Sequence, residues 1–301
     1  MRALRHLRLA IVAALLLAMV AAAACGGSSG PGHVLYGTRD GIVDYRLNDG
    51  TQSVRFSPIG GSSVALADPA LSPDGKRIAF VQQIAGRTAQ EPLGDLWVAN
   101  RDGTDSHAAF RHGDADLRVI APQWIDDLHV MAVIRVADGG GVAYTLERIA
   151  VGTGERTRVL AGVTSFGVSP DRRRIVYTVQ DQPGALWVAA ADGSAPAPLI
   201  VAGSQVVAVM SPRLSPGGKT VAFAAAPAPG APLDLYTMPS SGGPATVLAA
   251  LQDGAPSLAY SGDGRHIYVA TARGLSDVDA RTGAIRPLRD AEIVGAPQWM
   301  P

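Results

Sequence analysis

The sequence is poor in several residue types, and each shortage narrows its class. It contains one cysteine, Cys25, in 301 residues, so no disulfide can form within the chain. Lysine occurs only at Lys76 and Lys219, and the 26 basic residues balance the 26 acidic ones. Because there is no excess of positive charge and no basic stripe, nucleic acid is not expected as a partner.

Signatures of catalysis are also missing. No Gly-x-Ser-x-Gly elbow occurs, and Ser240 and Ser241 lie in a glycine-rich segment with no histidine or acid placed beside them. The glycine run at 139–141 follows a predicted strand without opening a helix, so it is not a phosphate-binding loop. We predict no catalytic residue and no cofactor.

One loop gathers possible metal ligands. It contains Asp105, His107, His112, Asp114 and Asp116. Their spacing fits neither a zinc site nor an EF-hand. We therefore predict a solvated polar loop and no metal site, with cation binding as the alternative.

The amino-terminal residues carry the one long hydrophobic run. Arg2, Arg5 and Arg8 are followed by an apolar stretch from Leu9 to Val20 and then by small residues. This pattern predicts a secretory signal peptide over residues 1–24. A transmembrane span is the alternative, but the run is near the lower length limit for one.

The end of this leader resembles the lipobox of bacterial lipoproteins. The residues are Ala22-Ala23-Ala24-Cys25, with alanine in place of the usual leucine at the first position. The resemblance implies that Cys25 carries the lipid, palmitate included, that anchors an extracytoplasmic protein to the bacterial cell membrane. A secreted protein with a free thiol is the alternative. Loss of the leader removes three arginines, which leaves 23 − 26 = −3 as net charge, and residues 25–32 form a flexible tether.

A sequence motif recurs six times in the remaining chain. An apolar residue precedes a tight turn such as Ser72-Pro73-Asp74-Gly75, a short apolar strand follows, and a second strand ends at Asp-Gly, Thr-Gly or Gly-Gly. The apolar anchors are Leu71, Trp124, Val168, Leu214, Tyr260 and Trp299, at steps of 53, 44, 46, 46 and 39 residues. This period is typical of a four-stranded propeller blade and is too long for leucine-rich or ankyrin repeats. The recurring Trp and Tyr side chains are expected in the blade cores.

The two ends of the repeat complete each other. The chain ends two residues after Trp299, where only the first strand of a blade is expected. Near the other end, the pattern from Gly32 to Tyr36 predicts a second strand and that from Gly41 to Asp44 a third. We predict an all-β fold, a six-bladed β-propeller of four-stranded antiparallel blades over residues 33–301. A composite blade made from both termini closes it.

These repeats resemble those of a known family. The Ser-Pro-Asp-Gly turn followed by Ile78-Ala79-Phe80 is similar to the repeat of TolB-like propellers, and the propeller part of LpqB-type lipoproteins is similar too. The resemblance implies the fold. It does not imply one activity, because TolB-like propellers serve protein complexes, peptidases and lyases.

The position of the tether predicts which side of the ring binds a partner. The ring is cut between the first and second strands of a blade, so this rim is expected nearest the bilayer, and the partner is expected on the opposite rim with its longer loops. The candidate contacts are the polar groups expected just before each inner strand: Asp68, Arg118, Gln123, Arg213 and Gln298. Solvated or capping roles are the alternative for each of them.

Two functions remain open from the sequence. The first is a non-catalytic scaffold, a monomeric propeller that binds an envelope or membrane protein, or an envelope polymer. The alternative is an envelope enzyme or sensor that uses the central channel for a small ligand or a metal. Glutamate is sparse and the histidines are not expected to recur in register, which favours the scaffold.

Overall fold

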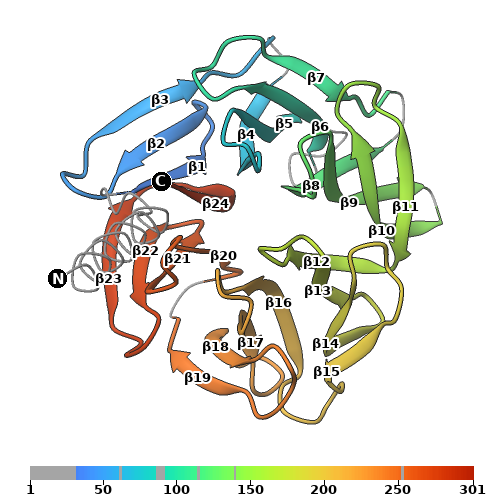
Figure 1. Ribbon diagram of the computed structural model, residues 1–301, viewed down its shortest axis with the longest axis vertical. Coiled ribbons are helices and arrows are strands. Elements are labelled where there is room, and N and C mark those ends of the chain that lie inside the picture. Colours follow the sequence, from blue (N-terminus) through green and yellow to red (C-terminus); the bar gives the residue numbers. More distant parts are fainter. Residues whose placement is uncertain (1–31, 61–62, 86–91, 114–115, 139, 252–253) are drawn as a thin grey trace, which may run out of the picture.

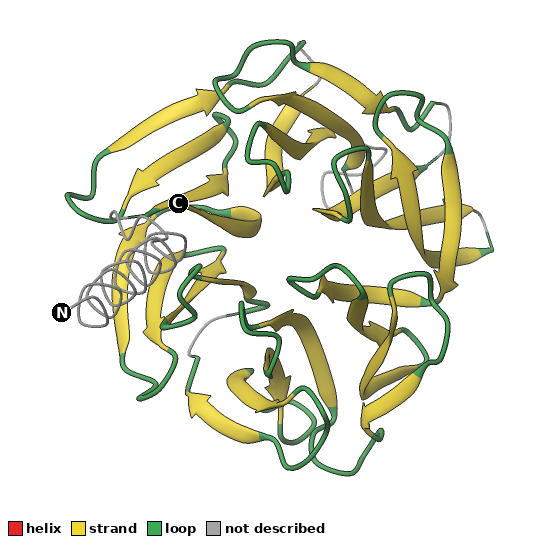
Figure 2. Ribbon diagram, in the orientation of Figure 1, coloured by secondary structure: helices red, strands yellow, loops and turns green. Residues whose placement is uncertain are grey.

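The computed structural model describes residues 32–60, 63–85, 92–113, 116–138, 140–251 and 254–301. The leader, Cys25 and most of the expected tether lie outside the described residues. All regular structure in the described part is β-strand (Figure 2), and no described helix could cross a membrane. Antiparallel four-stranded units stand side by side in a ring around a central axis (Figure 1). The predicted all-β propeller is confirmed.

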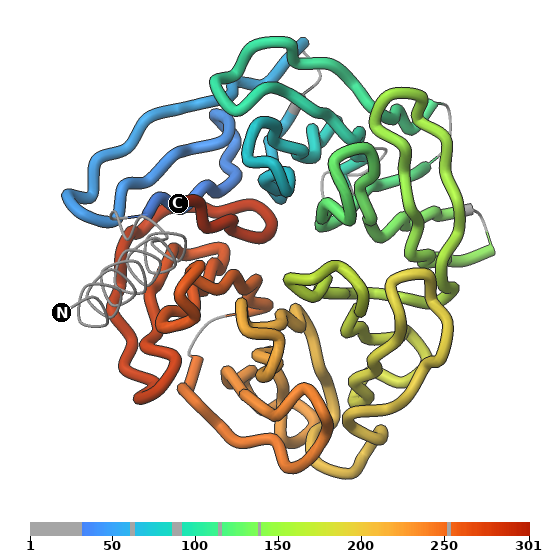
Figure 3. Tube along the Cα trace, viewed as in Figure 1, coloured from blue at the N-terminus to red at the C-terminus, as the bar shows by residue number. Residues whose placement is uncertain are grey.

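The first unit combines both ends of the chain. Its strands, in the order β24-β1-β2-β3, are Val294–Met300, His33–Gly37, Ile42–Arg46 and Gln52–Phe56. The pairing of β1 with β24 is antiparallel and runs from His33 opposite Met300 to Gly37 opposite Val294. The red end of the trace in Figure 3 therefore lies beside its blue beginning. The predicted composite blade is confirmed.

Three more units are separate four-stranded sheets that follow chain order. The first contains β12 to β15: Val163–Val168, Arg174–Val179, Gln182–Ala190 and Ala197–Ile200. The second contains β16 to β19: Ala208–Leu214, Thr220–Ala226, Asp234–Pro239 and Thr246–Ala249. The third contains β20 to β23: Ser257–Tyr260, His266–Thr271, Gly274–Asp279 and Ile285–Asp290.

The remaining strands form one eight-stranded sheet. Its first half contains β4 to β7: Ser63–Leu71, Arg77–Ile84, Leu93–Asn100 and His107–Phe110. Its second half contains β8 to β11: Leu117–Trp124, His129–Asp138, Gly141–Ala150 and Arg156–Ala161. Pairing within each half is antiparallel, and one parallel pair, Gly94 with Arg118, joins the halves.

The turns that begin Ser-Pro-Asp or Ser-Gly-Asp share the same hydrogen bonds. The buried Ser72 hydroxyl donates to Asp74 Oδ1 at 2.6 Å and accepts from the Arg77 amide at 2.9 Å. Ser169 and Ser261 make the same contacts in their own turns. The serine hydroxyl is the main cause of a lowered pKa of the carboxyl two residues later, as at Asp74. These hydrogen bonds explain why the motif recurs.

The ring has two different rims. The turn rim carries the connections between first and second and between third and fourth strands, for example 72–76 and 261–265. The loop rim carries all other connections, including 201–207 and 227–233. Gly32 and Pro301 lie on the turn rim, because the Gly32 carbonyl accepts from the Leu47 amide and the Pro301 carbonyl from Arg101 Nη2.

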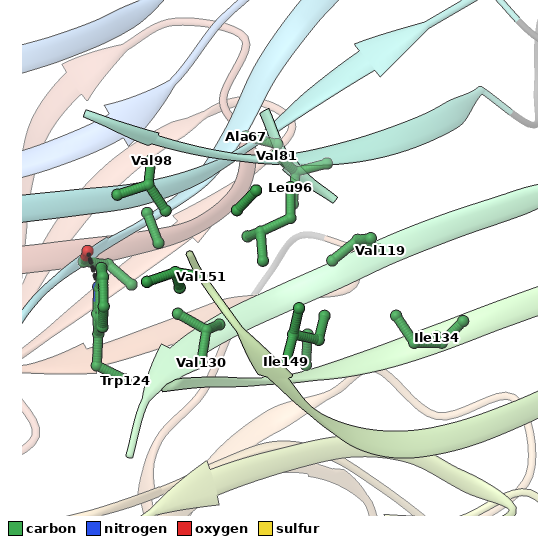
Figure 4. Close-up of a cluster of buried hydrophobic side chains, with 14 of the residues drawn as sticks. Ala67, Val81, Leu96, Val98, Val119, Trp124, Val130, Ile134, Ile149 and Val151 are labelled. Carbon is green, nitrogen blue, oxygen red and sulfur yellow. Dashed lines mark hydrogen bonds between the residues drawn. The ribbon is translucent and has the colours of Figure 1, made fainter. Parts of the chain in front are cut away.

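Apolar side chains fill the space between neighbouring units. Figure 4 shows the cluster between the two halves of the eight-stranded sheet, where Trp124 reaches across to β4. Its indole Nε1 donates to the Ala70 carbonyl at 2.9 Å, and the side chain is 4% exposed. Trp124 is therefore part of the core, as the sequence predicts, and its one polar atom is satisfied.

Candidate functional site

The inner strand of each unit lines the axis, and the candidate residues lie within these strands. Asp68 is in β4, Gln123 in β8, Arg213 in β16 and Gln298 in β24, all in the part that leads to the turn rim. Only Arg118, the second residue of β8, lies toward the loop rim. The expectation that these groups precede the inner strands and gather at the loop rim is therefore wrong. The strands begin earlier than the anchors suggested, because the bulges described next interrupt their pattern.

Prolines interrupt three inner strands at equivalent places. Asp68, Ala121 and Ser211 each precede a proline and have φ values of 51°, 50° and 52°. The pairing register of β4, β8 and β16 shifts at these points. A proline has no N–H to donate to the neighbouring strand, so the ladder breaks there and a bulge forms.

The Asp68 carboxylate connects three units through hydrogen bonds at the axis. Its Oδ1 accepts from the Ala296 amide at 2.6 Å and its Oδ2 from the Ala121 amide at 3.1 Å. These amides belong to β24 and β8, on either side of β4. The carboxylate is only 6% exposed, and both of its oxygens are engaged. This geometry is that of a structural clamp, since buried carboxylates are stabilised by such N–H donors.

Side chains also connect the next units. The Gln123 amide donates to the Phe166 carbonyl at 3.1 Å and accepts from the Val168 amide at 2.9 Å, which joins β8 to β12. The Ser211 amide donates to Ser165 Oγ at 3.0 Å, and Ser211 Oγ donates to the Pro256 carbonyl at 2.8 Å. Together with Asp68, these residues form a belt of hydrogen bonds from unit to unit, which we call the axial belt.

Arg213 is the cation of the axial belt. Its Nη1 donates to the Phe166 carbonyl at 2.6 Å and to the Pro212 carbonyl at 2.9 Å. Burial lowers the pKa of Arg213 to about 10, and the charge of Asp68 acts in the opposite direction. The residue therefore stays charged at neutral pH although its surroundings disfavour the charge.

The other two candidates lie in the inner strands β24 and β8. Gln298 Nε2 donates to the carbonyl of the next residue, Trp299, at 2.6 Å. Arg118 stands opposite Arg135 in the pairing of β8 with β9 and opposite Gly94 at the parallel bridge. The structure thus connects Asp68, Gln123 and Arg213 through the belt, whereas Arg118 lies nearer the loop rim.

The histidine loop is held by one buried acid. His112 contacts Asp95 Oδ1 through both its amide, at 2.8 Å, and its Nδ1, at 2.6 Å, and Asp95 is 1% exposed. His107 instead contacts the Asp105 carbonyl, and Asp114 lies outside the described residues. No group of three or more possible ligands that could hold a metal occurs among the described residues.

Two further clusters were not anticipated from the sequence. Asp44, 2% exposed, contacts His33 Nδ1 at 2.7 Å and Arg55 Nη2, and Arg55 also donates to the Arg101 carbonyl of the next unit. Burial raises the pKa of the Asp44 carboxyl, but the hydrogen bonds from Arg55 and His33 outweigh this and hold it below its ordinary value.

The same arrangement recurs one unit away. Asp277 contacts His266 Nδ1 at 2.8 Å and Arg286 Nη2 at 2.9 Å. His33, His129 and His266 each open the second strand of their unit. The expectation that the histidines do not recur in register is therefore wrong. The turns before these three histidines differ in sequence, so the sequence alone does not align them. Their common position at the start of the second strand is seen only from the strand bounds.

A cavity lies away from the axial belt. It has a volume of about 390 Å³ and lies beside the outer strands β22 and β23. Its lining includes Leu251, Thr271, Arg273 and Arg289. None of the five candidate residues lines it.

This geometry defines the class as an all-β propeller whose inner strands are connected by the hydrogen bonds of the axial belt, and its fold is TolB-like. The chain aligns with TolB from Acinetobacter baumannii at a TM-score of 0.67 and 16% identity, covering 90% of this chain and 67% of that one. The putative TolB from Agrobacterium tumefaciens gives 0.62 and 14%, with 90% and 100% covered. An oligogalacturonate lyase in complex with manganese gives 0.55 and 14%, with 83% and 70% covered.

Sequence comparison adds little beyond the fold. No family model matches the chain. Dipeptidyl-peptidase 5 from Porphyromonas endodontalis is 27% identical over 110 residues, which cover 36% of this chain and 15% of that protein. The chain thus matches only a small part of this relative.

Proposed function

We propose that the protein is a membrane-anchored extracytoplasmic lipoprotein whose propeller is a non-catalytic binding scaffold for an envelope protein. The leader and Cys25, which carry the anchoring part of the proposal, are known from the sequence alone. The position of Gly32 supports a tether on the turn rim. The loop rim then faces away from the bilayer and is free to meet a partner.

The proposal includes six blades. The eight-stranded sheet counts as two blades, because a single parallel pair joins its halves and each half repeats the four-stranded antiparallel plan. With the composite unit and three other sheets, this gives the six-bladed ring that the repeats predict. A likeness to the propeller of LpqB-type lipoproteins belongs to the same proposal.

The observation that carries the binding role is the way Ile59 is held on the loop rim. Its amide donates to Gln82 Oε1 at 3.2 Å, and its carbonyl accepts from Gln82 Nε2 at 2.8 Å. Gln82 is 4% exposed, whereas Ile59 is 43% exposed. A buried amide thus fixes the backbone of a loop residue whose apolar side chain projects into solvent. A preorganised apolar contact of this kind favours binding, because little conformational entropy remains to be lost.

Other exposed apolar residues lie on the same rim. Val64, at the start of β4, is 41% exposed, and Val201, directly after β15, is 62% exposed. Leu128, at 66%, lies on the turn rim instead. Single exposed apolar side chains are ordinary, but several on one rim of long connections suit a protein interface.

The axial belt supports a non-catalytic role. Asp68 and Gln123, two polar residues that could have served chemistry at the axis, are occupied with backbone groups of neighbouring units. A catalytic acid or base needs a lone pair or a proton within reach of substrate. The belt uses these atoms to hold the ring together.

Crosslinking in living cells, followed by affinity capture and mass spectrometry, tests this function. We expect a partner that is captured by the wild type and by Leu128→Glu, the matched control on the turn rim, but lost with Ile59→Glu and with Val201→Glu. We also expect Cys25→Ser to release the protein from the membrane fraction. Equal capture by the two loop-rim variants and the wild type would refute binding on this rim, and a membrane-bound Cys25→Ser protein would refute the anchor.

A further inference from the structure

Arg213 has N–H donors that form no hydrogen bond to another described residue. A guanidinium offers five N–H groups, and Nη1 alone accounts for the two hydrogen bonds to the Phe166 and Pro212 carbonyls. Nε and Nη2 have no hydrogen bond to another described residue, and neither is among the buried atoms that lack a partner. The side chain is half-buried. These two nitrogens therefore keep some accessible surface while Nη1 holds the group in place.

No acid within the described ring neutralises this cation. None of the ion pairs formed by described residues includes Arg213. The charge that acts on it is that of Asp68, whose oxygens are both engaged by the amides of Ala121 and Ala296. β4 and β16, which carry these two residues, lie on opposite sides of the ring (Figure 1).

A partly desolvated charge without a directly paired acid is unfavourable, and such groups concentrate at functional sites. Burial lowers the pKa of Arg213 to about 10. This lowered pKa has the same cause, because burial disfavours the charged form. An anion that binds the free edge of the guanidinium would remove most of this penalty. The Phe166 carbonyl, which also accepts from Gln123, keeps the guanidinium in a fixed orientation before any anion arrives.

We propose that Arg213 is an anion-binding residue at the axis and that its ligand is a single carboxylate, held by two parallel hydrogen bonds from Nε and Nη2. The planar fork of arginine matches the two oxygens of a carboxylate. A dianion fits less well, because one cation leaves it with a net negative charge that Asp68 repels across the ring. This site goes beyond the proposed scaffold function, since its ligand binds near the turn rim and not on the loop rim.

The carboxylate can come from a small molecule or from a polypeptide, and one experiment separates these sources. The Nε–H signals of arginine are followed by NMR in the full-length protein during titration with acetate, with inorganic phosphate and with chloride. We expect acetate to shift the Arg213 signal along a saturable one-site curve, phosphate to shift it less, and chloride to change it only slightly. Arg286, which is paired with Asp277, reports non-specific effects in the same spectrum.

A tripeptide with a free carboxyl terminus and its amidated form complete the test. Tighter binding of the free peptide than of acetate, lost on amidation, identifies a polypeptide source, whereas binding no tighter than that of acetate identifies a small molecule. Arg213→Gln should weaken acetate binding by about tenfold or more. The wild-type spectrum decides the matter even if this variant fails to fold. An Arg213 signal that does not respond to acetate, or that responds equally to chloride, refutes the site.

Discussion

Asp68 and Arg213 occupy opposite sides of the same ring, yet they use their charges differently. The Asp68 carboxylate has two oxygens and accepts one backbone amide on each. The Arg213 guanidinium donates through one nitrogen, and its other two nitrogens form no hydrogen bond to a described residue. Contacts within the fold thus occupy both oxygens of the Asp68 carboxylate, whereas they occupy only one nitrogen of the Arg213 guanidinium. The comparison teaches that a polar residue at a propeller axis has to be judged by the atoms it has left, not by its type.

The largest expected effect is that of Asp68→Ala. It leaves the amides of Ala121 and Ala296 without an acceptor in the core and places alanine at φ 51°. We expect the free energy of unfolding to fall by about 3–5 kcal/mol, because hydrogen bonds to charged groups are each worth about 1.5–3 kcal/mol. Denaturant unfolding measures this loss.

Two matched variants sharpen that result. Asp40→Ala removes an exposed carboxylate with no side-chain partner among the described contacts and should leave stability unchanged. Arg213→Gln should cost about 1 kcal/mol or less, because Gln123 still donates to the Phe166 carbonyl. If Arg213→Gln destabilises as much as Asp68→Ala, both residues are structural and the contrast disappears.

Asp44→Asn should have an intermediate effect that depends on pH. The folded state holds the pKa of Asp44 below its ordinary value of 3.8, so the unfolded chain takes up the proton first as the pH falls. The carboxylate therefore stabilises the protein above about pH 4, and this contribution disappears as the pH falls through the lower folded pKa. At neutral pH we expect a loss of about 2–3 kcal/mol.

Unfolding curves of wild type and Asp44→Asn between acidic and neutral pH measure this dependence. The difference between them should shrink toward zero in acid, because His33 and Arg55 then face a neutral group in both proteins. A difference that is constant with pH would mean that Asp44 acts through shape and not through charge.

The smallest effect is expected for Ser169→Ala in a Ser-Pro-Asp turn. It removes the hydroxyl that accepts from the Arg174 amide at 2.9 Å, and the loss should be about 1 kcal/mol, as for a local capping bond. Thermal unfolding suffices to detect it. A loss as large as that of Asp68→Ala would show that the turns contribute as much to the ring as the axis does.

The fold could be predicted because its signals are local and repeated. The turn at Ser72 recurs with its own hydrogen bonds, and the near-identity of Ala296-Pro297-Gln298-Trp299 to Ala121-Pro122-Gln123-Trp124 identified the closing strand. Each of these signals spans a few neighbouring residues. Such patterns are what a single sequence displays directly.

The candidate site could be predicted only in part. The sequence indicates Asp68, Gln123 and Arg213 as polar residues near the anchors. It does not indicate their rim or their partners, because these depend on contacts between residues 43 or more positions apart. One signal was available: the residue-Pro pairs at 68–69, 121–122 and 211–212 mark the bulges. The cluster around Asp44 has no such marker, since its members lie on three different strands.

The pairing of β1 with β24 also constrains how the protein is made. His33 and Met300 are 300 − 33 = 267 positions apart, and closing so long a loop costs about 5 kcal/mol of chain entropy. One edge of β1 therefore stays open until β24 has been synthesised. During this delay the free edge of β1 can pair with another strand, including β24 of a second copy. Pairing of β1 with β24 of the same chain thus competes with pairing to β24 of a second copy. Slow synthesis or high protein concentration favours the pairing between copies.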